Sequence, residues 1–301
     1  MKAKGDYSMK KALGLISSPR EKGNSEIMTK EIMLHIGGDN QFEILRLMDL
    51  HIEPCKGCYS CMKPQKKCPR DDDLGFLLQK IAEADGVILS SPVYHWGMNI
   101  GVGKILDRAF LFKHWAKTFA KKPCVTFVTY GLPYEEGYAL SALNGFVRQL
   151  NLLLKESAAF LGGSPGEVLR YGGNLERAKQ LGEALFDPSY QRKRNRFECP
   201  NCFGNMIKFR SAMDFPSPDI RPIRQVECAF CGTSVEIGIS EKEMEMDYIG
   251  KGLYDERFPE RLAEWHEATI RSFIKDRKEI ENRLKKYDSL DVKMLKGAGA
   301  I

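Results

Sequence analysis

The chain has 301 residues, 43% of them hydrophobic and 29% charged, with a formal net charge of +6 at pH 7. This length lies near the ceiling for one hydrophobic core, so more than one domain is expected. No stretch approaches the roughly 18 uncharged apolar residues that span a bilayer, and the amino-terminal MKAKGDYSMKKALGLIS lacks the apolar run of a signal peptide. We therefore expect no membrane insertion and a cytoplasmic location, while the mild charge singles out no class of partner.

From Lys11 to about Pro188, short apolar runs alternate with stretches of helical periodicity, which is typical of βα units on a parallel sheet. Strands are expected at five places: 12–17, 42–47, 86–91, 124–130 and within 158–169. Helices are expected at 25–36, 73–84, 98–119, 137–155 and 175–186, the second with Asp72 or Asp73 as its N-cap. The alternation predicts an α/β fold with a flavodoxin-like, doubly wound, five-stranded parallel sheet that binds ligands at the carboxyl ends of its strands.

The segment SSPREKGNSEIM follows the first predicted strand and leads into a helix. Hydroxyl groups, the amides of a turn and the positive end of a helix together suit a phosphate monoester. The side chains available to it are Ser18, Arg20, Asn24 and Ser25. This loop suits FMN, and the alternative is an ordinary polar turn in which Asn24 or Ser25 caps the helix. Nucleotide hydrolysis is disfavoured because neither GxGxxG nor a Walker A spacing occurs.

Four cysteines lie within fourteen residues, in PCKGCYSCMKPQKKCP: Cys55, Cys58, Cys61 and Cys68. Spacing of this kind indicates metal binding rather than a disulfide framework. Three thiolates separated by two residues each can wrap a cubane iron-sulfur cluster, and the fourth closes the cage from a short loop. The gap before the last cysteine is longer than in bacterial ferredoxins, so zinc and redox-active or plain thiols stay as alternatives.

Two further loops are predicted to meet the phosphate loop at the same edge of the sheet. The segment SSPVYHWGMNIGVGKILDR places Pro92, Val93 and Tyr94 at the end of the third strand, where a flavin ring needs a flat apolar wall and backbone donors. The fourth strand ends in TYGLPYEEGYAL, which puts Thr129 and Gly131 in the neighbouring loop. We therefore expect the ring between these two loops.

Several chemically suggestive side chains near these loops are expected to be structural. His95 is expected to be exposed or satisfied in the core rather than a proton donor. Lys104, Asp107 and Arg108 are expected to form ion pairs on a helix surface, and Cys124, inside a strand, is expected to act as a small core hydrophobe. No catalytic acid, base or nucleophile is assigned.

The composition changes abruptly at DPSYQRKRNR, residues 187–196. Two CxxC pairs follow, separated by 25 residues that include strand-like segments: Cys199, Cys202, Cys228 and Cys231. Four thiolates at this spacing predict a tetrahedral zinc ribbon, with a rubredoxin-like iron as the alternative. Either metal would help to fold a segment with too little apolar core of its own.

Apolar residues recur about every 3.5 positions from Phe258 to Tyr287, which predicts amphipathic helices. Three parts of the chain are therefore expected. They are a flavodoxin-like FMN-binding domain at 1–188 with its cysteine loop at 55–68, a metal ribbon at 189–240 and a helical segment at 241–301.

The run from SSPREKGNS through the cysteine motif to SSPVYHWGMNIGVGKILDR resembles the iron-sulfur flavoprotein family, a branch of the NADPH-dependent FMN reductase group. The resemblance covers about the first 190 residues. It implies non-covalent FMN, a 4Fe-4S cluster on the four clustered cysteines, and a homodimer or homotetramer in which the cluster of one subunit approaches the flavin of another. By position it implies Ser18, Arg20, Asn24 and Ser25 at the phosphate, and Pro92–Tyr94 with Gly131 at the ring.

The leading hypothesis is an oxidoreductase that passes electrons between ferredoxin or NAD(P)H and a small acceptor. The alternative is a redox-sensing regulatory or nucleic-acid-binding protein that uses the ribbon and the basic QRKRNR run. The enzyme is favoured because a basic interdomain run is usually a solvated linker and the ribbon has no aromatic platform for stacking bases. Nucleic acid is therefore not expected as a partner.

Overall fold

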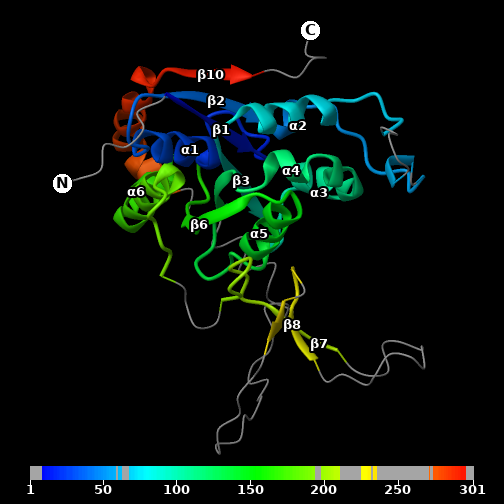
Figure 1. Ribbon diagram of the computed structural model, residues 1–301. Coiled ribbons are helices and arrows are strands. Elements are labelled where there is room, and N and C mark those ends of the chain that lie inside the picture. Colours follow the sequence, from blue (N-terminus) through cyan, green and yellow to red (C-terminus); the bar gives the residue numbers. More distant parts are fainter. Residues whose placement is uncertain are drawn as a thin grey trace, which may run out of the picture.

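The structure, a computed structural model, describes residues 9–58, 60–62, 68–193, 198–210, 225–231, 233–235, 271 and 274–295. A central parallel sheet has the strand order β10-β2-β1-β3-β5-β6, and the short β4 pairs antiparallel with β3 (Figure 1). The strands of this sheet are β1 (Lys10–Ile16), β2 (Asn40–Arg46), β3 (Gly86–Tyr94), β4 (Gly97–Met98), β5 (Pro123–Tyr130), β6 (Leu153–Leu161) and β10 (Val292–Leu295). The predicted α/β fold with its flavodoxin-like strand order is confirmed over β2, β1, β3, β5 and β6.

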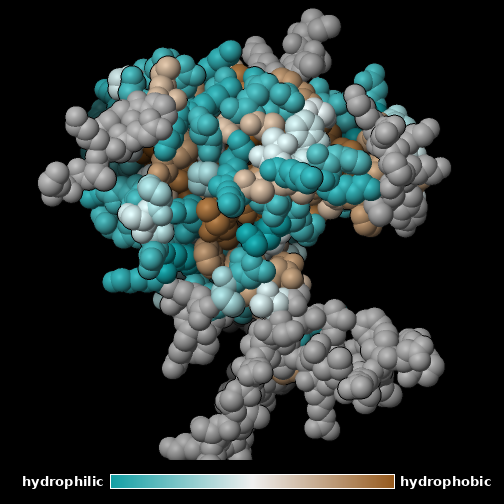
Figure 2. Space-filling model, in the orientation of Figure 1, coloured by the Kyte–Doolittle hydropathy of each residue, from teal (hydrophilic) through white to brown (hydrophobic). Residues whose placement is uncertain are grey.

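Helices bury both faces of the sheet. One face packs against α1 (Asn24–Leu34) and α6 (Gly172–Phe186). The other face packs against α2 (Leu74–Glu83), α3 (Ile100–Leu106), α4 (Ala116–Phe119) and α5 (Ala139–Gln149). Strands covered on both sides carry continuous apolar runs, as β1 does over residues 12–16 and β3 over residues 86–89. On the face of the molecule in Figure 2, hydrophobic residues show mainly as small patches between hydrophilic ones.

The helix predicted at 98–119 is wrong in its extent. Met98 belongs to β4, and the rest divides into α3, a 3-10 segment at Ala109–His114 and α4. The regular helix ends before Arg108, whose side chain turns inward to a buried carboxylate, that of Asp72. The prediction of one long helix treated Arg108 as a surface residue, whereas its side chain is buried.

The helix predicted at 137–155 ends at Gln149, and the strand expected within 158–169 begins earlier, at Leu153. Asn151 adopts the left-handed conformation, with φ +65°. The amide of Leu152 then donates to the carbonyl of Val147 at 3.2 Å. This is a Schellman-type ending, for which asparagine is a common residue, and it frees the apolar residues that follow to enter β6.

The carboxyl-terminal residues add a strand to the sheet where only helices were predicted. A helix at 274–284 precedes β10, which pairs parallel with β2 in the register Val292 to Phe42. Tyr287 is buried and donates its hydroxyl to the Glu31 carboxylate of α1, and Lys286 Nζ lies 2.5 Å from the same carboxylate. The predicted helical residues 258–270, 272 and 273 lie outside the described residues.

The second cysteine set lies beside a small antiparallel sheet of β7 (Ile207–Arg210), β8 (Gln225–Cys228) and β9 (Ser234–Val235), and Cys228 is the last residue of β8. It lies next to α5 (Figure 1). The Asn205 amide donates to Ser141 Oγ at 3.3 Å, and a side chain added at Gly145 would lie 3.1 Å from Phe230. We refer to residues 198–235 as the ribbon. In the part of the chain that the structure describes, no helix is long and apolar enough to cross a membrane.

Replacing Tyr287 with phenylalanine is expected to lower the free energy of unfolding by about 1–2 kcal/mol, because one hydrogen bond to a buried carboxylate is lost. Burial opposes the charge on Glu31, but hydrogen bonds from Lys286 and Tyr287 lower the pKa of Glu31 overall. A carboxyl group whose pKa is lowered by folding stabilises the folded protein at pH values above its pKa in the unfolded chain, and this stabilisation is lost as the pH falls. The difference in the free energy of unfolding between the wild type and Tyr287→Phe should therefore shrink in acid. Urea unfolding at several pH values measures this.

Tyr134→Phe is the matched control, because Tyr134 is 96% exposed. Its free energy of unfolding should stay within about 0.5 kcal/mol of the wild type. Equal stabilities for Tyr287→Phe and the wild type at neutral pH would show that the carboxyl-terminal segment is not anchored through Glu31.

Candidate functional site

The loop between β1 and α1 has the chemistry of a phosphate cradle. Ser17 and Ser18 are buried, and the Ser17 hydroxyl has no hydrogen-bond partner among the described residues. The Arg20 amide donates to Ser18 Oγ at 3.2 Å, which folds the loop back on itself. Helix α1 then begins at Asn24 with its positive end at the loop. A buried orphan hydroxyl beside free helix amides fits an anionic ligand.

Two of the predicted phosphate residues, Asn24 and Arg20, also contact the loop after β6. The Asn24 side chain donates to the Gly162 carbonyl at 2.7 Å and the Ser164 carbonyl at 2.9 Å, and it accepts from the Gly166 amide at 2.8 Å. Arg20 is exposed and reaches the Gly163 carbonyl at 3.4 Å. The Asn24 side chain therefore holds the β1–α1 loop against the loop that follows β6.

Ser25 and Thr129 are brought together, their hydroxyl oxygens 3.2 Å apart. Ser25 stands in the first turn of α1, and Thr129 stands at the end of β5, paired with Pro92 of β3. The backbone of Gly131 lies against Gly163, so that an added Cβ would be 3.2 Å from the Gly163 Cα. The loops after β1, β3 and β5 therefore meet at one edge of the sheet.

The predicted ring-binding residues lie on a tight hairpin between β3 and β4. Val93 pairs with Met98 and Tyr94 with Gly97, which leaves His95 and Trp96 as the two turn residues, with φ of 48° and 63°. Positive φ at both positions is the type I′ geometry of a two-residue hairpin. Residues other than glycine occupy it at a conformational cost, and such strain gathers at ligand sites. His95 is exposed.

Glycine at 137 lets the next loop close over this hairpin. Gly137 has φ +56°, and a Cβ there would lie 2.3 Å from the Trp96 Cβ and 2.5 Å from its carbonyl oxygen. The Tyr138 amide donates to that carbonyl at 2.9 Å. Tyr94 and Tyr138 are each 44% exposed. The hairpin is thus clamped by the loop before α5, and its aromatic side chains remain open to a flat ligand.

The four cysteines of the first motif line one pocket. Cys55 and Cys58 are exposed, while Cys61 and Cys68 are half-buried. Hydrogen bonds from the backbone and hydroxyl of Ser60 lower the pKa of the Cys58 thiol, which favours the thiolate that metals bind. Residues 59 and 63–67 of this segment lie outside the described residues. The pocket is also lined by Lys56, Gly57, Pro69, Arg70, Asp107, Arg108, Phe110 and Leu111.

The two ends of the cysteine segment are fastened together at a neck that we define by Glu53, Arg70, Asp72 and Arg108. The Glu53 amide donates to Asp72 Oδ2 at 3.0 Å. Arg108 forms an ion pair with Asp72, with side chains 4% and 1% exposed, and also donates to the Glu53 carbonyl at 3.4 Å. Arg70 forms an ion pair with the Glu53 carboxylate. The prediction of Arg108 as a helix-surface residue is wrong, because its partner is buried.

The neck residues Asp72 and Arg108 have no site role in the sequence prediction. The acidic run at 71–73, separated from Cys68 by two residues, was a signal for such a role, because one helix N-cap needs only one carboxylate. Asp72 and Asp73 have different partners in the structure. Asp73 is the N-cap residue of α2, one of the two positions predicted, and its carboxylate accepts from the His51 amide at 2.8 Å. The sequence around Arg46 contains no comparable signal of a role at the site. In the structure its side chain donates to the Pro19 carbonyl at 3.1 Å and so supports the phosphate loop.

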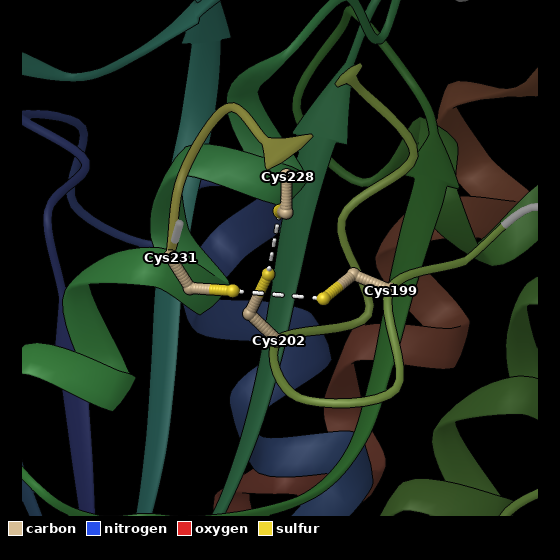
Figure 3. Close-up of side chains that lie close together, drawn as sticks. All are labelled: Cys199, Cys202, Cys228 and Cys231. Carbon is tan, nitrogen blue, oxygen red and sulfur yellow. Dashed lines mark hydrogen bonds between the residues drawn. The ribbon is translucent and has the colours of Figure 1, made fainter. Parts of the chain in front are cut away.

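The ribbon cysteines form a compact tetrad, with the two CxxC loops facing each other (Figure 3). Cys199 and Cys231 sulfurs are 3.5 Å apart, and Cys202 and Cys228 sulfurs are 3.4 Å apart. All four sulfurs lie within 4.8 Å of one another. A Zn–S bond of 2.3 Å places tetrahedral sulfurs about 3.8 Å apart, so the tetrad fits one metal ion.

The protonation of the tetrad also suits a metal. Burial alone would raise the pKa of Cys199, but amide donors at Asn201 and Cys202 lower it to about 7. Burial raises the pKa of Cys202 and of Cys228. Without a cation these buried thiols resist ionisation, whereas a bound ion would deprotonate them. Cys124, by contrast, is a buried core residue of β5 whose pKa is raised by burial, which confirms its predicted structural role.

The two cysteine sets differ in geometry. Among the described residues, the ribbon tetrad is the one compact group of cysteine, histidine or acidic ligands that could hold an ion. The first set surrounds a pocket instead. A cubane spreads its four cysteine sulfurs around several irons, so it needs a wider cage than one ion does. The first set therefore differs from the compact tetrad that fits one ion.

Comparison with known proteins agrees with this arrangement. The profile of the family described as NADPH-dependent FMN reductase matches residues 10–161. An iron-sulfur flavoprotein of Methanocaldococcus jannaschii is 38% identical over 100 residues, which are 33% of this chain and 51% of the relative. The match thus spans about half the length of that relative. An iron-sulfur flavoprotein of Archaeoglobus fulgidus is 29% identical over 189 residues, covering 60% of this chain and 82% of the relative.

Among solved structures, a flavone reductase superposes with a TM-score of 0.56 at 18% identity, covering 77% of this chain and 78% of that one. This likeness concerns the fold. The family profile spans the sheet from β1 to β6, and with it the loops that carry the phosphate, ring and cysteine residues. The chain therefore belongs to the NADPH-dependent FMN reductase family, with iron-sulfur flavoproteins among its relatives.

Proposed function

We propose that the protein is an FMN-dependent oxidoreductase that passes electrons between ferredoxin or NAD(P)H and a small acceptor, through FMN and a 4Fe-4S cluster. The observation that carries the proposal is the placement of four thiols around one pocket, beside the helix that starts at the ring-binding loop. Membership of the FMN reductase family supports the flavin. The names of the relatives support the cluster.

The residues at the edge of the sheet fit FMN. Ser18 and the amino-terminal turn of α1 would hold the phosphate, with Arg20 supplying charge from the surface. Asn24 would hold the loop in place through its hydrogen bond to the Gly162 carbonyl. The contact between the Ser25 and Thr129 hydroxyls would join the start of α1 to the end of β5 beside the phosphate. When bound, FMN accepts two electrons as hydride and releases them singly.

The ring would lie against the strained hairpin. Pro92, Val93 and Tyr94 offer a wall whose backbone is held in place by β4, and Gly131 leaves room beside it. The clamp at Gly137 keeps the hairpin from moving. In this role the chain excludes water from one side of the ring and orients it, and no described side chain is assigned as acid or base.

The pocket of the first motif fits a cluster held by Cys55, Cys58, Cys61 and Cys68. Lys56, Arg70 and Arg108 also line it, together with the carboxylate of Asp107. A cluster there would supply a one-electron carrier. The chain's own contribution is to hold the thiols, to lower the pKa of Cys58 and to close the neck.

Helix α3 connects the two proposed sites. The Asn99 amide donates to Ser91 Oγ at 2.8 Å, and the Asn99 side chain caps α3 by accepting from the Gly101 amide at 2.7 Å. The helix ends at Leu106, and the next two residues, Asp107 and Arg108, line the cysteine pocket. A helix of this length spans about 10 Å. The ring wall and the cysteine pocket are therefore linked by one short rigid element.

We also propose a homodimer or homotetramer, as the family resemblance implies. Apolar surface next to both sites supports this: Tyr94 at the ring wall, Ile100 at 61% exposure and Phe110 at 55% exposure. Contact between subunits through these side chains would bury them.

For the ribbon we propose zinc with a structural role, and a single iron is the alternative. The contact of the ribbon with α5 supports a structural role, since the metal would fix a segment that packs on the sheet domain. Nucleic-acid binding is not favoured by Arg192 of the basic run, because it is paired with Glu156 and Glu198 and stacks on Phe203. Residues 194–197 of that run lie outside the described residues.

Anaerobic addition of reduced ferredoxin or of NAD(P)H is expected to bleach the visible absorbance of the protein, because both proposed cofactors lose colour on reduction. Stopped-flow absorbance with each donor measures the effect. Absorbance that neither donor changes, together with salt-dependent retention on immobilised DNA, would favour the nucleic-acid-binding alternative instead.

Replacing Cys58 with alanine is expected to abolish the electron paramagnetic resonance signal of a reduced cubane and to remove about four irons per chain, because the cage loses one ligand. Cys202→Ala should do the reverse, losing about one metal ion from the ribbon and keeping the cubane signal. Cys124→Ala, at a cysteine in the core, is the control and should keep both. Loss of the same metal in both ligand variants would refute two separate centres.

Replacing Gly137 with alanine is expected to weaken FMN binding by about tenfold or more, because the added Cβ would overlap the Trp96 backbone at a left-handed position. Fluorescence titration of the apoprotein with FMN measures the dissociation constant. Gly172→Ala is the control, since a Cβ there meets nothing within 4 Å. Equal affinity in both variants would place the flavin away from the hairpin.

A further inference from the structure

Two arginines of the neck also line the cysteine pocket, and the Nε of each has no hydrogen-bond acceptor among the described residues. The side chains of Arg70 and Arg108 are 12% and 4% exposed. The Nε of each is buried and finds no acceptor in the part of the chain that the structure describes. Buried polar atoms are nearly always hydrogen-bonded, so each unpaired donor calls for an explanation.

The other contacts of the guanidinium groups limit where these donors can be used. Arg108 uses Nη1 for Asp72 and for the Glu53 carbonyl. Arg70 uses Nη1 for the Glu53 carboxylate. A guanidinium is planar and presents its donors in a fixed fork, so anchoring one nitrogen fixes the direction of the others. Both anchored groups border the pocket that the four thiols line.

The charge of the two arginines is largely cancelled at the neck. Asp72 and Glu53 pair with them directly, and the exposed Asp107 also lines the pocket, whereas Lys56 adds a positive charge. What remains beside the pocket is therefore less a positive field than two Nε–H donors without acceptors among the described residues. Sulfur of an iron-sulfur cluster accepts such hydrogen bonds, and they favour the more negative, reduced state.

We propose that Arg70 and Arg108 donate their Nε–H groups to sulfur atoms of the cluster bound by Cys55, Cys58, Cys61 and Cys68, and thereby raise its reduction potential. This inference rests on the proposed function. Reduction adds one electron, supplied by ferredoxin or by flavin reduced with NAD(P)H, and no bond is broken. Both arginines stay protonated throughout. They are positioning residues that act through hydrogen bonds to the cage.

The test replaces each arginine by lysine, which keeps the positive charge and the ion pair but removes the fixed Nε–H. Arg148→Lys is the matched control: its Nε is also buried without an acceptor among the described residues, its Nη1 donates to the Leu152 carbonyl, and it does not line the pocket. Iron per chain is measured first. The midpoint potential of the cluster is then measured by a redox titration monitored by electron paramagnetic resonance.

Wild type and Arg148→Lys are expected to share one midpoint. Arg70→Lys and Arg108→Lys should retain the iron and show about a tenfold fall in the ratio of reduced to oxidised cluster at the wild-type midpoint, which is 59 mV for one electron. If Arg108→Lys does not fold, Arg70→Lys decides the result, since its side chain is the more exposed of the two.

Variants that keep both iron and the wild-type midpoint would overturn the proposal. Loss of iron from a variant that retains FMN and its circular dichroism would also overturn it, in favour of a purely structural role. A wild-type protein with no cluster signal would overturn the proposed function as well. A wild-type signal with unshifted variants would overturn the role of the arginines alone.

Discussion

The buried ion pair between Arg108 and Asp72 joins the cysteine segment to the sheet domain, and the arrangement of both proposed sites depends on it. Both side chains are almost wholly buried. Removing one partner of such a pair leaves an uncompensated charge and costs about 3–5 kcal/mol. Because Arg108 follows α3 and Asp72 precedes α2, the pair closes the cysteine segment next to one end of α3, and the hairpin proposed to bind the ring lies at the other end.

The parallel sheet supplies the second constraint. β1 lies between β2 and β3, so the chain runs outward in both directions from it and leaves a crevice at the carboxyl ends of the strands. Polar contacts then join the loops around that crevice, Asn24 to the loop after β6 and Ser25 to Thr129 of β5. The site is thus assembled from segments far apart in the chain, and its shape depends on loops that brace one another.

The sequence pattern was sufficient for the strand order β2-β1-β3-β5-β6 and for the ribbon tetrad. Alternating apolar runs predicted the strand order, and CxxC spacing predicted the ribbon tetrad, because both depend on local periodicity. The strand β10 could not be predicted in the same way, since four residues carry little periodicity and their partner β2 lies about 250 positions earlier. Arg108 was misjudged because its partner Asp72 is 36 positions away, where no local pattern reports it. The end of α5 was the avoidable error, since an asparagine such as Asn151 is a recognised helix-ending residue.

The central claim is that Cys55, Cys58, Cys61 and Cys68 share one iron-sulfur cage beside an FMN site. Anomalous X-ray diffraction at the iron absorption edge, from crystals of protein purified without oxygen, tests it most directly. The account predicts four iron positions within the pocket that these thiols line, and FMN at the carboxyl ends of β1, β3 and β5. Disulfides among these cysteines, or a single metal ion in their place, would contradict it.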